Sequence, residues 1–384
     1  MQDLRVIVNQ KLRENRAARD AVLALISSGE AIAFVGAGLS APLKYPSWTD
    51  LLAKLNLLAN RIAPFDQPDV VKVDVLHYAE EIKRHFESKG ELPQFNNAIG
   101  REFMPRNGAN CTSAHHRLAK LPFRAFVTTN YDDCLEQALN DSAMDELGRA
   151  RPDPGAVIKA NKADRHIVSR FLRSIVDDVD KHQRCVGHIH GRYNDTSNII
   201  LAASDYENAY GLVLKGSKPR EVPSSTLHRQ LVWSLFATRQ LVFFGCSMED
   251  PYIKALLDMV AADLWEWDQP IHFVVLPVSE DSALSIDNIS LTFGRQGLQA
   301  VFFENCEGTF AGLDQLLDEA LERCQPDASK SAKRTERQSQ AERRISSEQT
   351  GPKPSAPPQD ETAQLKWLED VNETTARNLR KNEN

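Results

Sequence analysis

The sequence predicts an α/β protein built on a doubly wound, mainly parallel sheet, with a smaller helical lobe. Short apolar runs recur along the chain, and most are continuously apolar, as expected of strands that helices cover on both faces. Longer segments with helical spacing separate these runs, and that alternation is typical of parallel sheets. Several runs end in glycine, serine, asparagine or histidine, at the sheet edge where such folds bind ligands.

The elements follow from periodicity and from turn residues. The chain is expected to open with a helix up to about Ser28, because Leu4, Ile7, Val8 and Leu12 follow helical spacing. The expected strands are 31–37, 123–130, 184–191, 198–204, 240–247, 272–278 and 300–305. The expected helices between them are Trp48–Arg61, Ala114–Leu121, Tyr131–Leu139, Leu227–Thr238 and Tyr252–Leu264.

Domain organisation follows from connection lengths and composition. Residues 1–325 are expected to form one domain, with helical insertions at about 50–115 and 140–183 that form the smaller lobe. Residues 326–384 are rich in Ser, Gln, Pro and mixed charge, and such a segment buries too little apolar surface to offset chain entropy. We expect a disordered tail there, with a short C-terminal helix around Trp367 as the alternative to a purely solvated segment.

Composition excludes several function classes. The net charge of −7 gives no electrostatic footprint for direct nucleic-acid binding. No apolar run approaches the roughly 20 residues that span a bilayer, and the charged N-terminus does not look like a signal peptide, so a cytoplasmic location is expected. The six cysteines form no C-x-x-C pair, which argues against a disulfide framework or a zinc ribbon.

The first candidate site follows the strand at 31–37. Gly36, Ala37 and Gly38 place bare backbone at the strand end, where a phosphate or ribose can approach the main chain. Ser40 adds a hydroxyl group. The alternative is a tight strand-to-helix turn that binds nothing. The absence of a third glycine in G-x-G-x-x-G spacing argues against an ordinary dehydrogenase.

The next strand end, 123–130, closes with Thr128, Thr129 and Asn130, and Asp132 follows at once. These residue types are also the usual helix caps, so capping is the alternative interpretation. A fourth strand end, "GCSMEDP", repeats the opening pattern with Gly245 and Ser247.

The strand end "GHIHG" carries two histidines, of which His190 lies at the edge beside Gly191. A histidine at a strand end is a candidate acid or base, and a core histidine with satisfied ring nitrogens is the alternative. A metal site made by His182, Cys185, His188 and His190 is disfavoured, because one strand cannot direct all four side chains to a single ion.

The four motifs "GAGLSAP", "TTNYD", "GHIHG" and "GCSMEDP", taken in order, resemble the sirtuin family, specifically the prokaryotic sirtuin-like NAD glycohydrolases of antiphage defence. The resemblance covers about residues 30–280. It implies a Rossmann-like domain that binds NAD between its two lobes, with the glycine motif at the phosphates. It further implies that Gly36, Ala37, Gly38 and Ser40 line the NAD site, that Asn130 and Asp132 hold the nicotinamide ribose, that His190 is catalytic, and that Gly245 and Ser247 lie near the adenine ribose.

Two departures from the deacylating sirtuins shape the expectation. The segment after the His-Gly motif contains no cysteine, so the four-cysteine zinc module is missing and no zinc is expected. The chain between Asn130 and His190 is also longer than in deacylating sirtuins, which points away from a groove for acyl-lysine peptides.

Hydrolysis of NAD to nicotinamide and ADP-ribose, with depletion of cellular NAD in abortive infection, is therefore expected. The alternatives are a zinc-free NAD-dependent deacylase and a non-catalytic subunit that senses NAD or ADP-ribose. The resemblance also implies a homo-oligomer, or a defence partner such as a HerA-type ATPase or a short Argonaute.

Overall fold

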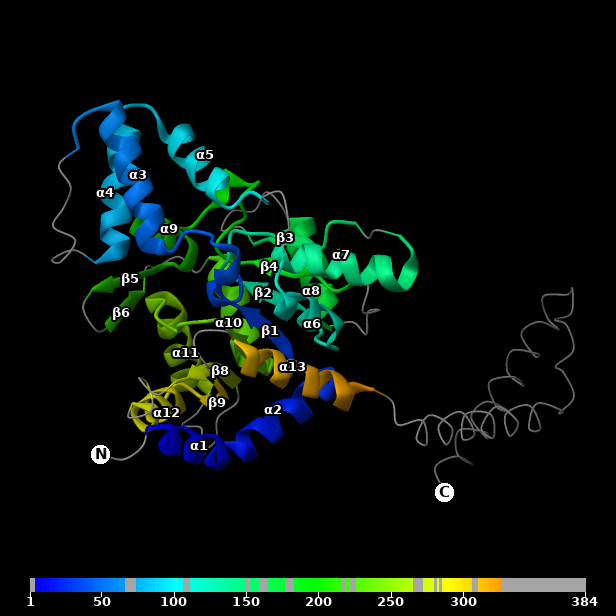
Figure 1. Ribbon diagram of the computed structural model, residues 1–384. Coiled ribbons are helices and arrows are strands. Elements are labelled where there is room, and N and C mark those ends of the chain that lie inside the picture. The colour runs from blue at the N-terminus through cyan, green and yellow to red at the C-terminus, as the bar shows by residue number, and fades with distance from the viewer. Residues whose placement is uncertain are drawn as a thin grey trace, which may run out of the picture. The chain divides into compact units, whose positions relative to one another are not determined.

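Figure 1 shows the computed structural model, in which residues 1–325 belong to the unit described below. The tail expected at 326–384 lies outside the described residues, as does His182. Among the described residues, no helix is long and apolar enough to cross a membrane. The described residues are 4–65, 74–105, 111–149, 152–158, 165–176, 183–215, 218–221, 226–264, 272–279, 282, 285–305 and 310–325.

A seven-stranded sheet in the order β3-β4-β2-β1-β7-β8-β9 forms the centre of the fold, and every neighbouring pair of strands is parallel. The predicted doubly wound, mainly parallel sheet is confirmed. The order reverses at β1, because β2 and β4 extend the sheet on one side of it and β7 to β9 on the other. The strands are β1 Ile32–Val35, β2 Phe126–Thr128, β3 Gly155–Val157, β4 Val186–His188, β7 Leu241–Phe244, β8 His272–Val278 and β9 Leu298–Glu304.

Helices cover both faces of the sheet, which explains why β1 is apolar at every position. Ala33 and Val35 pack in the cluster made with α2, α6, α7 and α13, whereas Ile32 and Phe34 pack in the cluster made with α8, α10, α11 and α12. The bounds are α1 Leu4–Glu14, α2 Arg16–Ser28, α6 Ser113–Lys120, α7 Cys134–Leu147, α8 Arg165–Val176, α10 Leu227–Thr238, α11 Pro251–Leu264, α12 Ile286–Gly294 and α13 Ala311–Cys324.

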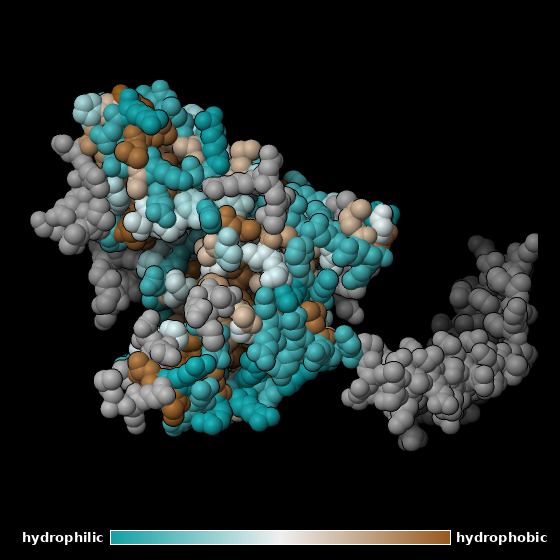
Figure 2. Space-filling view, viewed as in Figure 1, coloured by the Kyte–Doolittle hydropathy of each residue, from teal (hydrophilic) through white to brown (hydrophobic). Residues whose placement is uncertain are grey.

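A helical lobe stands apart from the sheet helices, at the top of Figure 1, and consists of α3 Trp48–Ile62, α4 Val75–Ser88 and α5 Leu92–Glu102. These helices share their own apolar cluster. Figure 2 shows apolar residues on this lobe, where the Leu57 side chain is 64% exposed. The lobe is tied to α9 (Ala203–Tyr210), because Lys83 Nζ lies 2.6 Å from Asp205 Oδ1 and the Ser204 amide donates to Glu80 Oε2 at 3.0 Å.

Some expected elements are wrong. The segment expected as a strand at 198–204 is instead irregular over residues 199–202, between a 3-10 turn, Thr196–Asn198, and the start of α9. Its apolar residues Ile199, Leu201 and Ala202 pack into the core of the helical lobe rather than into the sheet. The Asp205 carboxylate also accepts from the Leu201 and Ala202 amides, which starts the helix.

The opening helix is divided in two at Asn15. The Asn15 side chain donates to the Ala300 carbonyl at 2.9 Å and accepts from the Phe302 amide at 2.8 Å, so it binds β9 instead of continuing a single straight helix. The patterns also missed β3 and the antiparallel hairpin made by β5 (Leu212–Lys215) and β6 (Lys218–Glu221). The strand expected at 184–191 ends at His188.

Candidate active site

The glycine motif lies where the strand order reverses, between the carboxyl ends of β1 and β7, which is where doubly wound sheets bind ligands. The Gly38 amide donates to the Gly245 carbonyl oxygen at 2.8 Å. A Cβ atom on Gly36 or Gly38 would lie 2.7 or 2.8 Å from that oxygen, and Gly245 itself has a φ of +63°. Glycine is therefore needed at these three positions because the two backbone turns pass so close to each other. We call this contact between Gly36, Gly38 and Gly245 the glycine crossing.

Most amides of this turn already donate within the protein. Gly36 donates to Phe244, Gly38 to Gly245, and the two residues that follow donate to carbonyl groups inside the turn. Among the described residues, the amide of the exposed Ala37 has no such acceptor. Of the backbone amides from Gly36 to Ser40, that of Ala37 is therefore the one left for a ligand.

Ser40 and Asn130 meet across the ends of β1 and β2. Thr128 Oγ1 donates to the Val35 carbonyl at 2.8 Å and accepts from the Asn130 amide at 3.0 Å, which fixes the turn after β2. The Asn130 side chain then points to Ser40, with Nδ2 donating to Ser40 Oγ at 3.4 Å. Asn130 Oδ1 is buried and has no hydrogen-bond partner among the described residues. An acceptor is thus left available beside the glycine crossing.

Asp132 lies on the same turn and is 5% exposed. Its Oδ1 accepts from the Cys134 amide at 3.1 Å, at the start of α7. Helix capping, the alternative that the sequence left open, is therefore one role that Asp132 has in this structure. The second oxygen of its carboxylate remains for other contacts.

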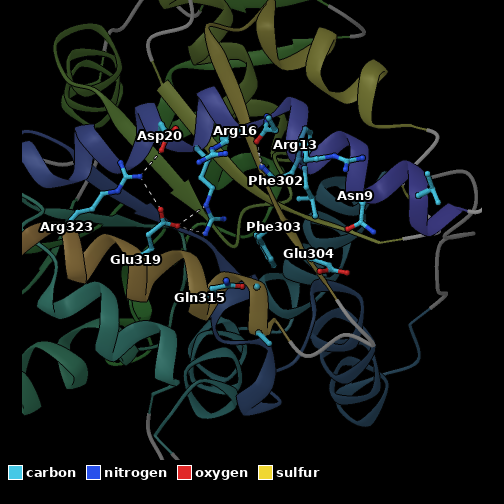
Figure 3. Close-up of a pocket in the computed structure, with 16 residues that line it drawn as sticks. Asn9, Arg13, Arg16, Asp20, Phe302, Phe303, Glu304, Gln315, Glu319 and Arg323 are labelled. Carbon is cyan, nitrogen blue, oxygen red and sulfur yellow. Dashed lines mark hydrogen bonds and ion pairs between the residues drawn. The ribbon is translucent and has the colours of Figure 1, made fainter.

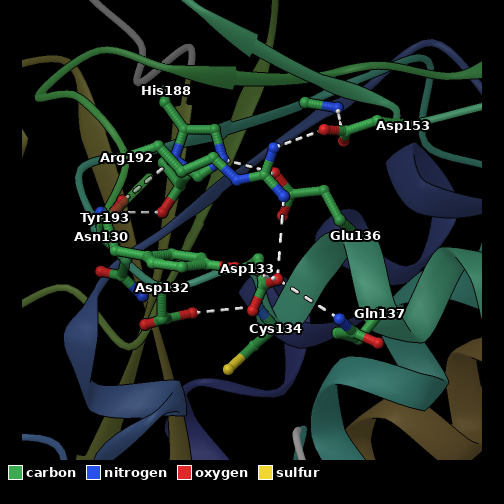
Figure 4. Close-up of polar contacts among 12 residues, drawn as sticks. Asn130, Asp132, Asp133, Cys134, Glu136, Gln137, Asp153, His188, Arg192 and Tyr193 are labelled. Carbon is green, nitrogen blue, oxygen red and sulfur yellow. Dashed lines mark hydrogen bonds and ion pairs between the residues drawn. The ribbon is translucent and has the colours of Figure 1, made fainter. Parts of the chain in front are cut away.

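A buried ionic cluster lies beside Asn130 and is shown in Figure 4. It consists of Glu136 of α7, His188 of β4, Arg192, which follows β4, and Asp153, which precedes β3. His188 is fully buried, with Nε2 2.5 Å from Glu136 Oε1 and Nδ1 3.1 Å from the Asn130 carbonyl oxygen. Arg192 adds a second cation, because its Nε lies 3.5 Å from Glu136 Oε1 and its Nη1 lies 2.6 Å from Asp153 Oδ2.

The Glu136 carboxylate in this cluster favours the protonated form of His188. Burial by itself would lower the pKa of His188, but the Glu136 carboxylate outweighs it, and the pKa is raised. A protonated His188 donates to both Glu136 and the Asn130 carbonyl, so the cluster fixes the backbone that carries the Asn130 amide. Sequence analysis missed Glu136 and Arg192; the one local signal is that Arg192 directly follows the His-Gly motif.

His190 lies two residues beyond the end of β4, and Gly191 follows it with a φ of +91°. Its Nε2 lies 2.9 Å from the Tyr210 hydroxyl and 3.8 Å from Asp250 Oδ2. Its Nδ1 lies 3.5 Å from the Tyr206 hydroxyl, which donates to Asp250 Oδ2 at 3.1 Å. Burial lowers the pKa of His190, and Asp250 opposes that effect.

Sequence analysis also missed the tyrosines around His190. Tyr206 and Tyr210 lie one turn apart on α9, and their rings pack on Tyr252 of α11. They leave His190 only 3% exposed. The hydroxyl groups of Tyr206 and Tyr210 thus close off the His190 imidazole in this structure.

Ser247 is exposed, and its Oγ accepts from the Glu249 amide at 3.4 Å. Of the residues in the disfavoured metal hypothesis, His188 and His190 have the separate partners given above, and Cys185 Sγ donates to the Gln183 carbonyl oxygen. Elsewhere, on the helical layer of α6 and α7, Cys111, His116 and Asp141 place one ligand atom each within 4.8 Å of one another. That cluster has the donor types of a metal site, but it includes none of the predicted site residues.

A separate cavity of about 890 Å³ lies between α1, α2, the end of β9 and α13, as Figure 3 shows. Arg19 pairs with Glu319 and Arg323 with Asp20, each at 2.7 Å. None of the residues predicted from the motifs lines it. We assign the candidate site to the strand ends, because the buried acceptor of Asn130, the imidazole of His190 and the glycine crossing are found there.

Comparison with known proteins shows which family and which relatives the chain resembles. Residues 124–292 match the model of the SIR2-like domain family, a span that includes the motifs of Asn130, His190 and Gly245. This segment is therefore similar to a SIR2-like domain. The chain is 27% identical over 252 residues to the NAD(+) hydrolase ThsA of Bacillus cereus (strain MSX-D12), an alignment covering 64% of this chain and 43% of that protein.

Two further relatives carry the same name. The protein of Enterococcus faecium is 24% identical over 65% of this chain and 44% of its own length. The protein of Acinetobacter baumannii (strain 532279) is 30% identical over 33% of this chain and 24% of its own length. The chain thus spans less than half the length of these relatives.

Proposed function

We propose that this protein is an NAD glycohydrolase that cleaves NAD to nicotinamide and ADP-ribose, and that it depletes cellular NAD in antiphage defence. The similarity to the SIR2-like domain and the NAD(+) hydrolase activity of the ThsA relatives support the reaction class. The observation that carries the proposal is the buried, unpartnered Oδ1 of Asn130, held beside Ser40 at the reversal point of the sheet. A buried acceptor without a partner costs free energy unless a ligand or water satisfies it.

The chemistry suits these side chains. When the bond between the nicotinamide nitrogen and the ribose C1′ breaks, nicotinamide leaves with the electron pair, and positive charge develops at C1′. Asn130 orients the ribose or the attacking water without acting as a nucleophile itself. The water oxygen then bonds to C1′, and the proton that it loses passes to His190. The nearby carboxylate of Asp132 favours the positive charge that develops in the transition state.

We further propose how NAD lies in the site. The pyrophosphate faces Gly36, Ala37 and Gly38, with the Ala37 amide as its donor. Gly245 and Ser247 face the adenine ribose, and Ser247 is exposed and therefore accessible to it. NAD is the substrate, and no part of the reaction as proposed requires zinc.

The test measures nicotinamide release from NAD by the purified full chain, alone and after assembly with the product of a neighbouring gene. We expect weak turnover alone, because His190 is closed in by Tyr206 and Tyr210, and strong turnover once a partner or a phage-derived trigger opens the site. Partner classes implied by the family are a second copy of the chain, a HerA-type ATPase or a short Argonaute. No direct contact with nucleic acid is expected.

The control variants separate the rival functions. Asn130→Ala should lower the release about 100-fold, whereas Glu249→Gln, at an exposed position near the site, should leave it unchanged. Release that depends on an acylated peptide would identify a deacylase instead. Tight NAD binding without release under every condition, including phage challenge of cells that carry the neighbouring gene, would identify a sensor.

A further inference from the structure

We propose that Asp250 is a positioning residue for His190, which it holds, together with the Tyr206 hydroxyl, in the orientation and tautomer that leave Nε2 as the base. This inference rests on the proposed function and deepens it. Asp250 belongs to the "GCSMEDP" motif, from which sequence analysis took only Gly245 and Ser247.

The two carboxylate oxygens of Asp250 have separate roles. Oδ1 accepts from the Tyr252 amide at 2.9 Å and the Ile253 amide at 3.0 Å, which caps α11 and fixes the carboxylate. Oδ2 turns the other way, toward Tyr206 and His190. A residue needed only as a cap does not require the second set of contacts.

The directions of the hydrogen bonds assign the tautomer. The Tyr206 hydroxyl donates its proton to Asp250 Oδ2, so its oxygen is left as an acceptor for His190 Nδ1–H. With that proton on Nδ1, Nε2 is an acceptor, and the Tyr210 hydroxyl, 2.9 Å away, is its donor. The neutral ring therefore carries its proton on Nδ1 and its lone pair on Nε2, and a substrate hydroxyl or water that replaces Tyr210 meets a base.

Charge supports the same assignment. The groups that face His190 are Asp250, the tyrosines Tyr206, Tyr210 and Tyr252, and, behind Tyr210, His228 of α10. Burial lowers the pKa of His228 to about 3 and raises those of the tyrosines, so these groups are neutral at pH 7. Asp250 is the anion of this set, and it stabilises the imidazolium that forms when Nε2 takes a proton.

The experiment compares Asp250→Asn with Glu249→Gln in the full chain. Asparagine is as good a cap as aspartate, so α11 is retained while the charge is removed. The pKa of His190 is measured by NMR on protein labelled with ¹³C at histidine Cε1, with the His190 signal assigned by its loss in His190→Gln. We expect Asp250→Asn to lower that pKa by about half a unit or more, and Glu249→Gln to leave it unchanged.

Kinetics provide the second measurement. In Asp250→Asn, we expect kcat for nicotinamide release to fall about tenfold or more, KM to stay within about threefold, and the acid limb of the pH profile to move to lower pH. Tyr206→Phe keeps the charge and removes the hydroxyl bridge, so it should lower kcat with KM unchanged and without the same fall in pKa.

The NMR titration and the kinetic measurement together distinguish a failure of this inference from a failure of the proposed function. An unchanged pKa of His190 in Asp250→Asn would overturn the inference, whatever happens to the rate. If the wild-type chain releases no nicotinamide under activating conditions, the hydrolase proposal fails. The NMR titration would then still decide whether Asp250 is coupled to His190.

Discussion

The glycine crossing and the ionic cluster lie at the same edge of the sheet, but opposite physical reasons fix them. At the crossing, Gly36 and Gly38 leave no room for a side chain against Gly245. Beside Asn130, the fully buried His188 is held by opposite charges. The glycine crossing therefore tolerates no added side-chain volume, and the ionic cluster tolerates no loss of charge. Variants that add volume and variants that remove charge should thus affect the two regions differently.

The largest effect is expected from Glu136→Gln. Removing one partner of a buried ion pair leaves His188 without its counter-ion, although Arg192 keeps Asp153, and we expect a loss of about 3 kcal/mol in the free energy of unfolding. Urea denaturation at pH 7 measures this loss. The control is Glu81→Gln, because the Glu81 side chain is 51% exposed and its pair with Arg84 is long, so a change below about 0.5 kcal/mol is expected.

The buried pair of His188 and Glu136 also predicts that the stability of the protein depends on pH. The pKa of His188 is raised in the folded protein, so the stability that its charge contributes is fully present below about pH 6.5, the unfolded value, and is lost as the pH rises through the folded pKa. Stability of the wild type should decline above that pH, and Glu136→Gln should flatten the decline. Equal slopes in the two proteins would show that His188 is not the titrating group.

The next largest effect is expected on activity. Asn130→Ala should lower nicotinamide release about 100-fold, equivalent to about 2.7 kcal/mol in the activation barrier. The substitution should cost less than about 1 kcal/mol in the free energy of unfolding. Among the described residues, the Asn130 side chain makes one long hydrogen bond, from Nδ2 to Ser40, and its Oδ1 has no partner. Turnover and thermal melting are measured on the same preparation. A folded variant with near-normal turnover would remove Asn130 from the reaction.

The sequence predicted those parts of the site that a short stretch of the chain contains by itself, namely the strands and the residues that directly follow them. Continuous apolar runs identified β1, β2, β4 and β7, and the residues just beyond those strands meet at one edge because the strands are parallel. The charged partners were missed, because Glu136 has the spacing of an ordinary helix residue and only the sheet register brings His188 beside it.

The tyrosines of α9 were missed for a different reason. The run that precedes them, at 199–201, has strand-like composition. Ile199 and Leu201 pack in the helical lobe and Ile200 packs against the sheet, so packing between distant segments overrides the local preference. Asp250 and Tyr206 likewise come from separate elements, α11 and α9, and no local pattern joins them.

A smaller effect tests the glycine crossing. In Gly38→Ala, the new methyl group would lie 2.8 Å from the Gly245 carbonyl oxygen, and we expect a loss of about 2 kcal/mol in stability from overpacking. Gly294→Ala is the matched control, because nothing lies within 4 Å of its Cβ position, and in a helix it should be neutral or slightly stabilising. If both variants melt alike, the two turns do not cross as closely as the structure shows.

The smallest effect is expected from Ser247→Ala, which tests the proposed position of the adenine ribose. The Ser247 hydroxyl is exposed, so its removal should not disturb the fold. One neutral hydrogen bond to the substrate contributes about 1 kcal/mol, so KM for NAD should rise about fivefold. The reacting bond lies far from the adenine ribose in NAD, so this binding is equal in the ground and transition states, and kcat should not change. An unchanged KM would place the adenine ribose elsewhere, and a fall in kcat would put Ser247 near the nicotinamide end.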